Sequence, residues 1–236
     1  MAPRSRSGAE SVTSCEAVPF ADFERSMFDR RLVAAPFLRG ADGKPHPYLP
    51  IPRAWASVRG ITLHQTACDM GERIERYDTI GSHFAVLRSG RVLRLSDEAR
   101  IIYHGHGWNS QCVGIEINGL YAGVEGDPRT VWDDPSTPYR EQPQQVTPFA
   151  MESTRQLVRW IVENVRRHGG AVKILCAHRQ AVDSRRNDPG EAIWRQVALP
   201  LHEELGLSDG GPGFKLPGST GYAIPEVWGG VKGVKY

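Results

Sequence analysis

Three short apolar runs in this chain each lead into a polar residue that can bind a metal ion or move a proton. The runs are GITLHQT, VGIEI and KILCAH, and they carry His64, Glu116 and His178. Each run is too short for a buried helix and is typical of a buried strand. Open α/β sheets place their ligands at the carboxyl ends of strands, so a sheet that aligns these runs would bring the three side chains together.

Helical and strand patterns alternate along the rest of the chain. Thr147 and Pro148 predict the start of a helix whose apolar residues recur at helical spacing until Gly169. The segments HFAVL and RVLRL predict a hairpin around Gly90. Further helices are predicted around Phe20 to Val33, in residues 68–82 and in residues 191–206, the last interrupted at Pro200. We therefore expect an α/β fold, a single domain with a central mixed β-sheet flanked by helices.

Composition shifts divide the chain into an N-terminal extension (1–55), a main domain (56–207) and a Gly/Pro-rich tail (208–236). Within the main domain, residues 118–146 show neither helical nor strand period and predict a long loop, a candidate rim or lid. Five apolar residues argue that the tail wraps the domain or binds a partner: Phe214, Tyr222, Ile224, Val227 and Trp228.

Charge and cysteine content exclude several classes of protein. The net charge of +2 gives no reason to expect a nucleic-acid partner. Four cysteines without a CxxC pair predict free thiols in a reducing compartment. The chain has no apolar signal-peptide core and no run of eighteen apolar residues. We expect a soluble protein made in the cytoplasm, without membrane insertion and as a monomer.

Asp188 follows His178 by ten residues, and with His64 these residues supply the three ligands that a catalytic zinc site takes from protein. Spacing alone is weak support, because 114 residues separate the histidines and ordinary core histidines are the common alternative. Glu116 alternates with Val113, Ile115 and Ile117, so it faces either the site or water.

Four segments in order resemble the successive motifs of zinc-dependent N-acetylmuramoyl-L-alanine amidases of the type 2 family, which shares its fold with peptidoglycan recognition proteins. They are ITLHQTA, SHFAVLRSGRVLRL, YHGHGWNSQCVGIEING and AHRQAVDSRRNDPG, and the resemblance covers roughly Gly60 to Leu207. It implies that residues 56–207 form the amidase catalytic domain. It also implies Zn²⁺ as cofactor and peptidoglycan or muropeptide as substrate.

Carried over to this chain, the resemblance makes His64, His178 and Asp188 the zinc ligands and Glu116 the acidic catalytic residue. A zinc-activated water would attack the amide between N-acetylmuramic acid and L-alanine, and Glu116 would carry its proton to the leaving amine. The family often has lysine two residues before the metal aspartate, where this chain has Arg186. We expect Arg186 to supply the positive charge for the oxyanion without donating a proton.

Other positions are assigned less directly. Ser82 stands where the family commonly has tyrosine, and the neighbouring His83 is expected to pack or hydrogen-bond inside the fold. His104, Trp108 and Asn109 are assigned to the substrate cleft, although Trp108 fits the core equally well. Cys112 and Cys176 are expected to be buried packing.

These expectations leave several settings open for one activity. The chain would be a peptidoglycan amidase acting as a phage endolysin, a delivered lytic effector or a muropeptide-recycling enzyme. In the first two settings it would meet the cell wall only after release or delivery. A peptidoglycan-recognition module or an interaction protein on the same fold, without catalysis, is the alternative. The complete ligand set with Glu116 favours the enzyme.

Overall fold

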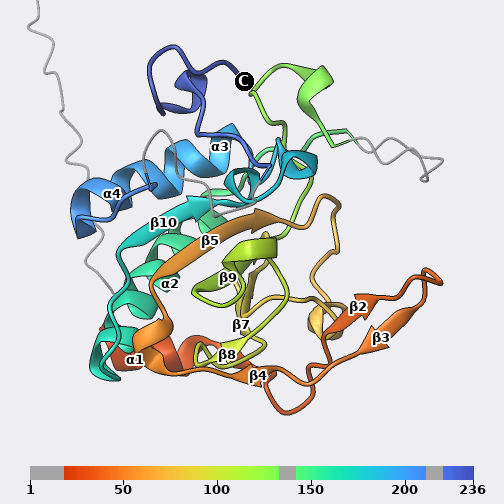
Figure 1. The fold of residues 1–236 in the computed structure, drawn as a ribbon, viewed down its shortest axis with the longest axis vertical. Coiled ribbons are helices and arrows are strands. Elements are labelled where there is room, and N and C mark those ends of the chain that lie inside the picture. The colour runs from red at the N-terminus through yellow and green to blue at the C-terminus, as the bar shows by residue number, and fades with distance from the viewer. Residues whose placement is uncertain (1–18, 133–141, 211–219) are drawn as a thin grey trace, which may run out of the picture.

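A six-stranded mixed sheet forms the centre of the computed structural model, which describes residues 19–132, 142–210 and 220–236 (Figure 1). The strand order is β1-β7-β6-β9-β5-β10. The strands are β1 (Phe28–Asp29), β5 (Gly60–Gln65), β6 (Phe84–Val86), β7 (Val92–Arg94), β9 (Cys112–Ile117) and β10 (Ile174–Ala177). Only β6 and β7 pair antiparallel among these, as the predicted hairpin. The expected mixed sheet, and a strand in each of the three apolar runs, are confirmed.

The parallel register of β5 with its neighbours sets the two faces of the sheet. Ile61 pairs with Val113 and Leu63 with Ile115, and all four side chains lie in the main core. His64 pairs with Glu116, and because side chains alternate along a strand, both point to the opposite face. Helices therefore cover one face of the sheet, while the candidate site lies on the other.

Helix α2 (Pro148–Arg167) covers the apolar face as its sequence predicts. The Thr147 hydroxyl accepts a hydrogen bond from the Ala150 amide, and Pro148 occupies the first turn. Leu157 and Ile161 are fully buried against the sheet, and burial of such a side chain contributes about 1.5–3 kcal/mol.

The last helical segment runs as α3 (Glu191–Ile193), a π-helical turn (Trp194–Ala198) and α4 (Leu199–Leu205). The sequence predicted an interruption at Pro200, and the irregular turn lies just before it. Proline has no amide hydrogen to donate to the carbonyl of Gln196. Arg155 of α2 donates to that carbonyl instead (2.8 Å), which ties the two helical segments together.

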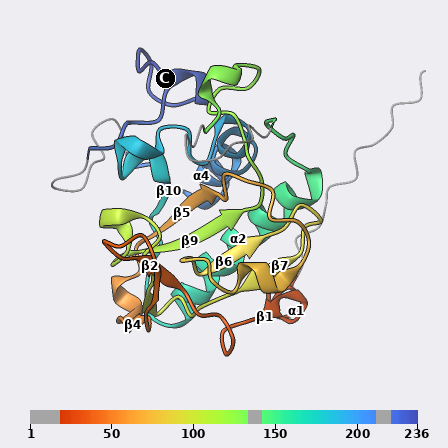
Figure 2. The same ribbon diagram turned by 90° about the vertical axis from the view of Figure 1, so that its right-hand side faces the viewer.

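Two predicted helices are wrong in extent. Residues 68–82 form only a 3-10 turn at Ile74–Tyr77, because Gly71 has a left-handed φ of 73°, which a right-handed helix does not allow. The helix predicted from Phe20 to Val33 ends at Ser26 as α1 (Phe20–Ser26), because residues 28–29 pair with β7 instead. The N-terminal extension thus supplies an edge strand of the sheet, with α1 beside it (Figure 2).

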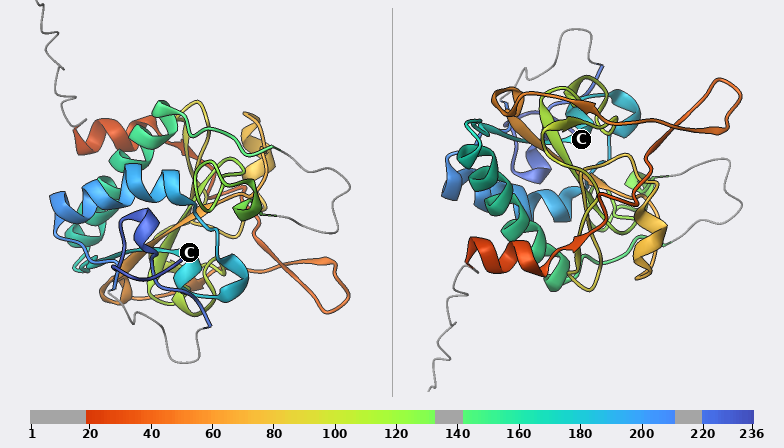
Figure 3. Two further views of the ribbon diagram at one scale, coloured as in Figure 1. Left: turned by 90° about the horizontal axis from the view of Figure 1, so that it is seen from above. Right: turned by 90° about the horizontal axis from the view of Figure 1, so that it is seen from below.

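Smaller elements surround this core. Strands β2 (Phe37–Arg39) and β3 (Pro45–Pro47) form a hairpin that projects from the body (Figure 3). Strand β4 (Ile51–Pro52) pairs with β8 (Arg100–Ile101). The remaining 3-10 turns are η1 (Trp55–Ser57), η3 (His106–Trp108), η4 (Pro128–Thr130), η5 (His178–Gln180), η6 (Asp183–Arg185) and η8 (Glu226–Trp228). None of the helices in the described ranges is long and apolar enough to cross a membrane.

Residues 220–236, here called the C-terminal strap, return to the body of the domain. Ile224 and Trp228 are buried in the main core, whereas Tyr222 and Val227 are partly exposed. The wrapping expected from the apolar residues of the tail is confirmed for this segment. The fifth residue of that prediction, Phe214, lies outside the described residues.

Candidate metal centre and active site

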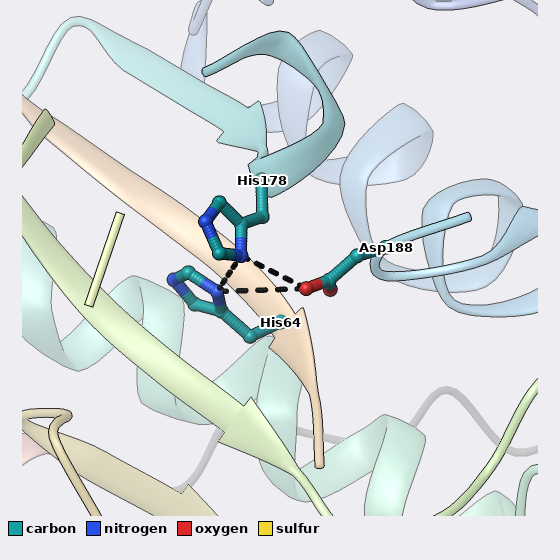
Figure 4. A group of neighbouring side chains, drawn as sticks. All are labelled: His64, His178 and Asp188. Atoms are coloured by element: carbon teal, nitrogen blue, oxygen red, sulfur yellow. Dashed lines mark hydrogen bonds and ion pairs between the residues drawn. The ribbon is translucent and has the colours of Figure 1, made fainter. Parts of the chain in front are cut away.

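His64, His178 and Asp188 converge on one point at the carboxyl edge of the sheet (Figure 4). His64 is the penultimate residue of β5, His178 directly follows β10, and Asp188 comes from the loop beyond it. Nδ1 of His64 lies 2.9 Å from Nδ1 of His178, which lies 2.9 Å from Oδ2 of Asp188. Nδ1 of His64 lies 3.9 Å from Oδ2 of Asp188. The three predicted ligands are therefore together, and all are buried.

The spacing of these atoms suits a zinc ion. Tetrahedral coordination with bonds near 2.0–2.1 Å places ligand atoms about 3.3 Å apart, between the short and long separations found here. Two imidazole nitrogens and one carboxylate oxygen are also the donor types that catalytic zinc sites use. These three residues form a group that can hold a metal ion.

The hydrogen bonds behind His64 require its Nδ1 to present a lone pair. Nε2 of His104 lies 3.2 Å from the carbonyl oxygen of Cys112, which only accepts, so His104 carries its proton there. Burial lowers the pKa of His104 to about 3, so the ring is neutral and its Nδ1 is an acceptor. Nε2 of His64 must then donate to it across 3.0 Å. The Nδ1 lone pair of His64 is left to face His178 and Asp188.

Gln65 fixes the loop that carries Asp188. Its backbone amide donates to Oδ1 of Asp188 (2.9 Å), which leaves Oδ2 toward the histidines. Its side-chain amide donates to the carbonyls of Asn187 (3.0 Å) and Pro189 (3.1 Å). Gln65, which follows the candidate ligand His64, therefore fixes the backbone on both sides of the candidate ligand Asp188. The sequence pattern did not indicate this interaction.

Glu116 lies on β9 opposite His64 and lines the same cavity as His178 and Asp188. Its pKa is raised well above the ordinary value, first by burial and then by the negative charge of Asp188, while Arg185 opposes the shift. Oε2 of Glu116 is buried and has no hydrogen-bond partner among the described residues. A buried carboxylate without a partner is costly and is a mark of a functional group.

The cavity at this site has a volume of about 600 Å³, within the range of sites for small ligands. Beyond the metal group, its wall is formed by residues from distant segments of the chain. Phe37 and Arg39 come from the projecting hairpin, and Trp132 comes from the long loop. The N-terminal extension and the loop predicted as a rim thus both contribute to the cavity wall.

Of the three residues predicted to contact substrate, His104 lies in the cavity wall, whereas Trp108 lies in the core and Asn109 bonds its own loop. His104 lines the cavity, as expected, and also bonds His64. Trp108 is only 1% exposed and packs with Cys112 and Cys176, so the structure supports its alternative assignment to the core. Oδ1 of Asn109 accepts from the amides of His104 (2.9 Å) and Gly105 (2.7 Å), which commits that oxygen to the loop.

His83 is a structural residue, as expected. Its Nε2 bonds the carbonyl of Arg100 (2.9 Å), and its Nδ1 accepts from the Gly114 amide (3.0 Å). Ser82, in place of the family's tyrosine, is fully buried.

Arg186, the predicted cation, does not line the cavity. It is exposed, and its guanidinium lies over Tyr236 of the C-terminal strap at 4.8 Å. The preceding residue, Arg185, lines the cavity instead. His106, which the sequence left unassigned, places Nδ1 3.1 Å from Nε2 of His178, the counterpart of the contact between His104 and His64.

Comparisons with known proteins agree with this geometry. The sequence model of the N-acetylmuramoyl-L-alanine amidase family matches residues 54–191, more than half of the chain. No curated protein sequence matches significantly.

Solved structures give distant matches. The endolysin N-acetylmuramoyl-L-alanine amidase LysCS from Clostridium intestinale URNW is 18% identical with a TM-score of 0.46, over 68% of this chain and 93% of that one. Peptidoglycan recognition protein-LE, solved with tracheal cytotoxin, is 15% identical with a TM-score of 0.50, over 78% and 97%. Drosophila peptidoglycan recognition protein SA is 15% identical with a TM-score of 0.44, over 69% and 86%. The second match shows a shared fold.

The family match includes His64, Glu116, His178 and Asp188, the residues that meet at the carboxyl edge of the sheet. The chain belongs to the type 2 N-acetylmuramoyl-L-alanine amidase family.

Proposed function

We propose that this protein is a zinc-dependent peptidoglycan amidase that hydrolyses the amide between N-acetylmuramic acid and the L-alanine of the stem peptide. The observation that carries the proposal is the convergence of three ligand atoms beside a cavity lined by Glu116, whose buried Oε2 has no hydrogen-bond partner among the described residues. Family membership supports the bond that is cleaved. The related recognition protein was solved with a monomeric diaminopimelic acid-type peptidoglycan, which supports the substrate class.

Zinc held by His64, His178 and Asp188 would supply a Lewis acid that polarises the amide carbonyl and lowers the pKa of a coordinated water to about 7. The second histidines, His104 and His106, hold the two ligand rings in place through their outer nitrogens. The residues of the chain thus orient the ligands before substrate arrives.

Glu116 moves the proton in this proposal. Burial and the charge of Asp188 raise the pKa of Glu116, which makes its carboxylate a stronger base than an exposed one. The carboxylate takes a proton from the attacking water and then delivers it to the nitrogen of L-alanine as the carbon–nitrogen bond breaks. The products are a muramic acid carboxylate and a stem peptide with a free amino terminus.

The proposal is tested by incubating purified protein with sacculi and with soluble muropeptides, with and without chelator, and identifying new ends by mass spectrometry. We expect free L-alanine amino termini that disappear with chelator. Glu116→Gln should lose this activity and retain zinc, because the carboxylate is not among the ligands.

The competing candidate is a recognition module that uses the same cavity to bind muropeptide without cleaving it. Retained muropeptide binding, with no new ends from zinc-loaded wild-type protein, would support that module and overturn the enzyme.

A further inference from the structure

Two consecutive arginines next to the metal aspartate point in different directions. Arg185 ends the 3-10 turn η6 and Arg186 follows it, so their side chains are separated by roughly 120° around the turn. The guanidinium of Arg186 lies 4.8 Å from the ring centre of Tyr236 and 5.4 Å from that of Tyr222. The C-terminal strap therefore holds Arg186 on the outside of the loop.

Arg185 lines the cavity together with Glu116 and Asp188. Its guanidinium lies 4.6 Å from the ring centre of Trp132, another residue of the cavity wall. Across the parts of the chain that the structure describes, Arg185 forms no ion pair with a carboxylate, and its Nε is buried without a hydrogen-bond partner. The arginine is thus a positive charge held against an aromatic ring in the cavity wall.

The charge of Arg185 acts on a residue of the proposed reaction. It lowers the pKa of Glu116 against the larger effect of burial. Arg186 does not contribute to the shift at Glu116. Of the two arginines, Arg185 is therefore the one whose field reaches the reacting centre.

We propose that Arg185, rather than Arg186, is the catalytic cation that binds the oxyanion formed when water adds to the scissile amide. This inference rests on the proposed function. As the water oxygen bonds the carbonyl carbon, the carbonyl electron pair moves to oxygen, and Glu116 holds the proton that water loses. When the electron pair returns, the bond to nitrogen breaks and the nitrogen receives that proton. The guanidinium keeps its own protons throughout, since it stays charged at working pH.

A fixed donor aimed at developing charge stabilises the transition state more than the ground state. The contact with Trp132 holds the guanidinium of Arg185 in the cavity wall, where no carboxylate of the described residues forms an ion pair with it. In this chain the cation therefore comes one residue earlier than the position where the family often has lysine.

The test compares Arg185→Gln and Arg185→Lys with the matched control Arg186→Gln in zinc-loaded protein. We expect Arg185→Gln to lower kcat by about 10²–10³-fold with little change in KM, as for loss of one oxyanion donor. Arg185→Lys should recover part of kcat because it keeps the charge. Arg186→Gln should stay within about threefold of wild type. Loss of kcat in Arg186→Gln with retention in Arg185→Gln would overturn the assignment.

A second readout separates this inference from the proposed function. A phosphinate analogue of the scissile amide carries a tetrahedral anionic centre, and its binding can be measured by calorimetry even if no amide is cleaved. Arg185→Gln should weaken phosphinate binding by at least tenfold while zinc content, measured by elemental analysis, stays at the wild-type level. Equal affinities in wild type and Arg185→Gln would reject Arg185. Absence of cleavage by wild type would reject the amidase independently.

Discussion

Nε2 of His64 donates a hydrogen bond to Nδ1 of His104 across 3.0 Å, and the opposite nitrogen of His104 bonds the carbonyl of Cys112. This chain of bonds, which begins at the backbone of β9, fixes both the rotation and the protonation of the candidate metal ligand His64. Because His104 is buried and neutral, its Nδ1 remains a hydrogen-bond acceptor for His64. His104 and the carbonyl of Cys112 therefore orient the candidate metal centre, although neither belongs to the ligand group.

Removal of His104 should weaken zinc binding. His104→Ala deletes the acceptor for His64, and loss of such a supporting bond typically costs 10–100-fold in metal affinity. His104→Gln keeps an oxygen acceptor and should recover part of the affinity. The measurement is a competition titration against a chromophoric chelator. His46→Ala, on the exposed hairpin, is the matched control. Wild-type affinity in His104→Ala would contradict the role given to the hydrogen bond.

Zinc should stabilise the fold, and the stabilisation should depend on Asp188. A ligand at 100 times its Kd stabilises the native state by about 2.7 kcal/mol if it does not bind the unfolded chain. Asp188→Asn keeps an oxygen for the Gln65 amide but loses the anionic ligand. Thermal unfolding with and without zinc should show a raised Tm in wild type and a much smaller shift in Asp188→Asn. An equal shift in both proteins would place the stabilising zinc elsewhere.

The sequence predicted the strands and their shared edge well, because buried strands are short apolar runs and the parallel register then follows from the sheet. His64, Glu116 and His178 meet for that reason. The alternation along β9 also places Val113 and Ile115 in the core and Glu116 in the cavity. Local pattern and tertiary structure agree here.

Positions set by turns and by distant partners could not be predicted in the same way. The sequence pattern does not separate two neighbouring arginines in a turn. In the structure, Arg185 lies beside Trp132 in the cavity wall, and Arg186 lies beside Tyr236 of the strap. The sequence allowed Trp108 to be either a sugar-binding residue or a core residue. Its burial against Cys112 and Cys176 could not be predicted, because it depends on how distant strands align. Hydrogen bonds between histidines 40 or 72 residues apart leave no periodic signal.

The metal-free protein should lose stability in acid through two histidines outside the metal centre, the buried His83 and the half-buried His202. Burial lowers the pKa of both His83 and His202 below 6.5. Their contribution to the free energy of unfolding is complete above pH 6.5, the pKa of histidine in the unfolded chain. It is lost as the pH falls toward their lower pKa values in the folded protein, because the unfolded chain then binds more protons. Each histidine adds at most about 1.4 kcal/mol per pH unit to the slope of the free energy of unfolding against pH.

Urea unfolding of wild type and His202→Gln between pH 7.5 and 5 checks this expectation. Glutamine keeps a donor for the carbonyl of Leu175, which His202 bonds at 2.8 Å, but it does not titrate. His202→Gln should therefore lose less stability on acidification than wild type. Identical pH slopes in the two proteins would show that His202 does not contribute to the acid sensitivity.

Trp228 should link the stability of the fold to the metal loop. Its ring is fully buried in the main core and lies 4.7 Å from the guanidinium of Arg179. The backbone amide of Arg179 donates to the carbonyl of Asp188 (3.0 Å), and its side chain donates to the carbonyl of Arg186 (2.7 Å). The C-terminal strap thus supports, through one arginine, the loop that supplies a metal ligand.

Trp228→Ala should lower the free energy of unfolding by about 3–5 kcal/mol, the usual cost of removing a buried aromatic side chain. Val227→Ala, a strap residue that is 37% exposed, is the control and should cost less than about 1 kcal/mol. Urea denaturation measures both. Zinc affinity of the folded fraction should also fall in Trp228→Ala, because Arg179 loses the nearest of the three aromatic rings beside its guanidinium. Unchanged zinc affinity beside lowered stability would mean that the strap stabilises the core without positioning Asp188.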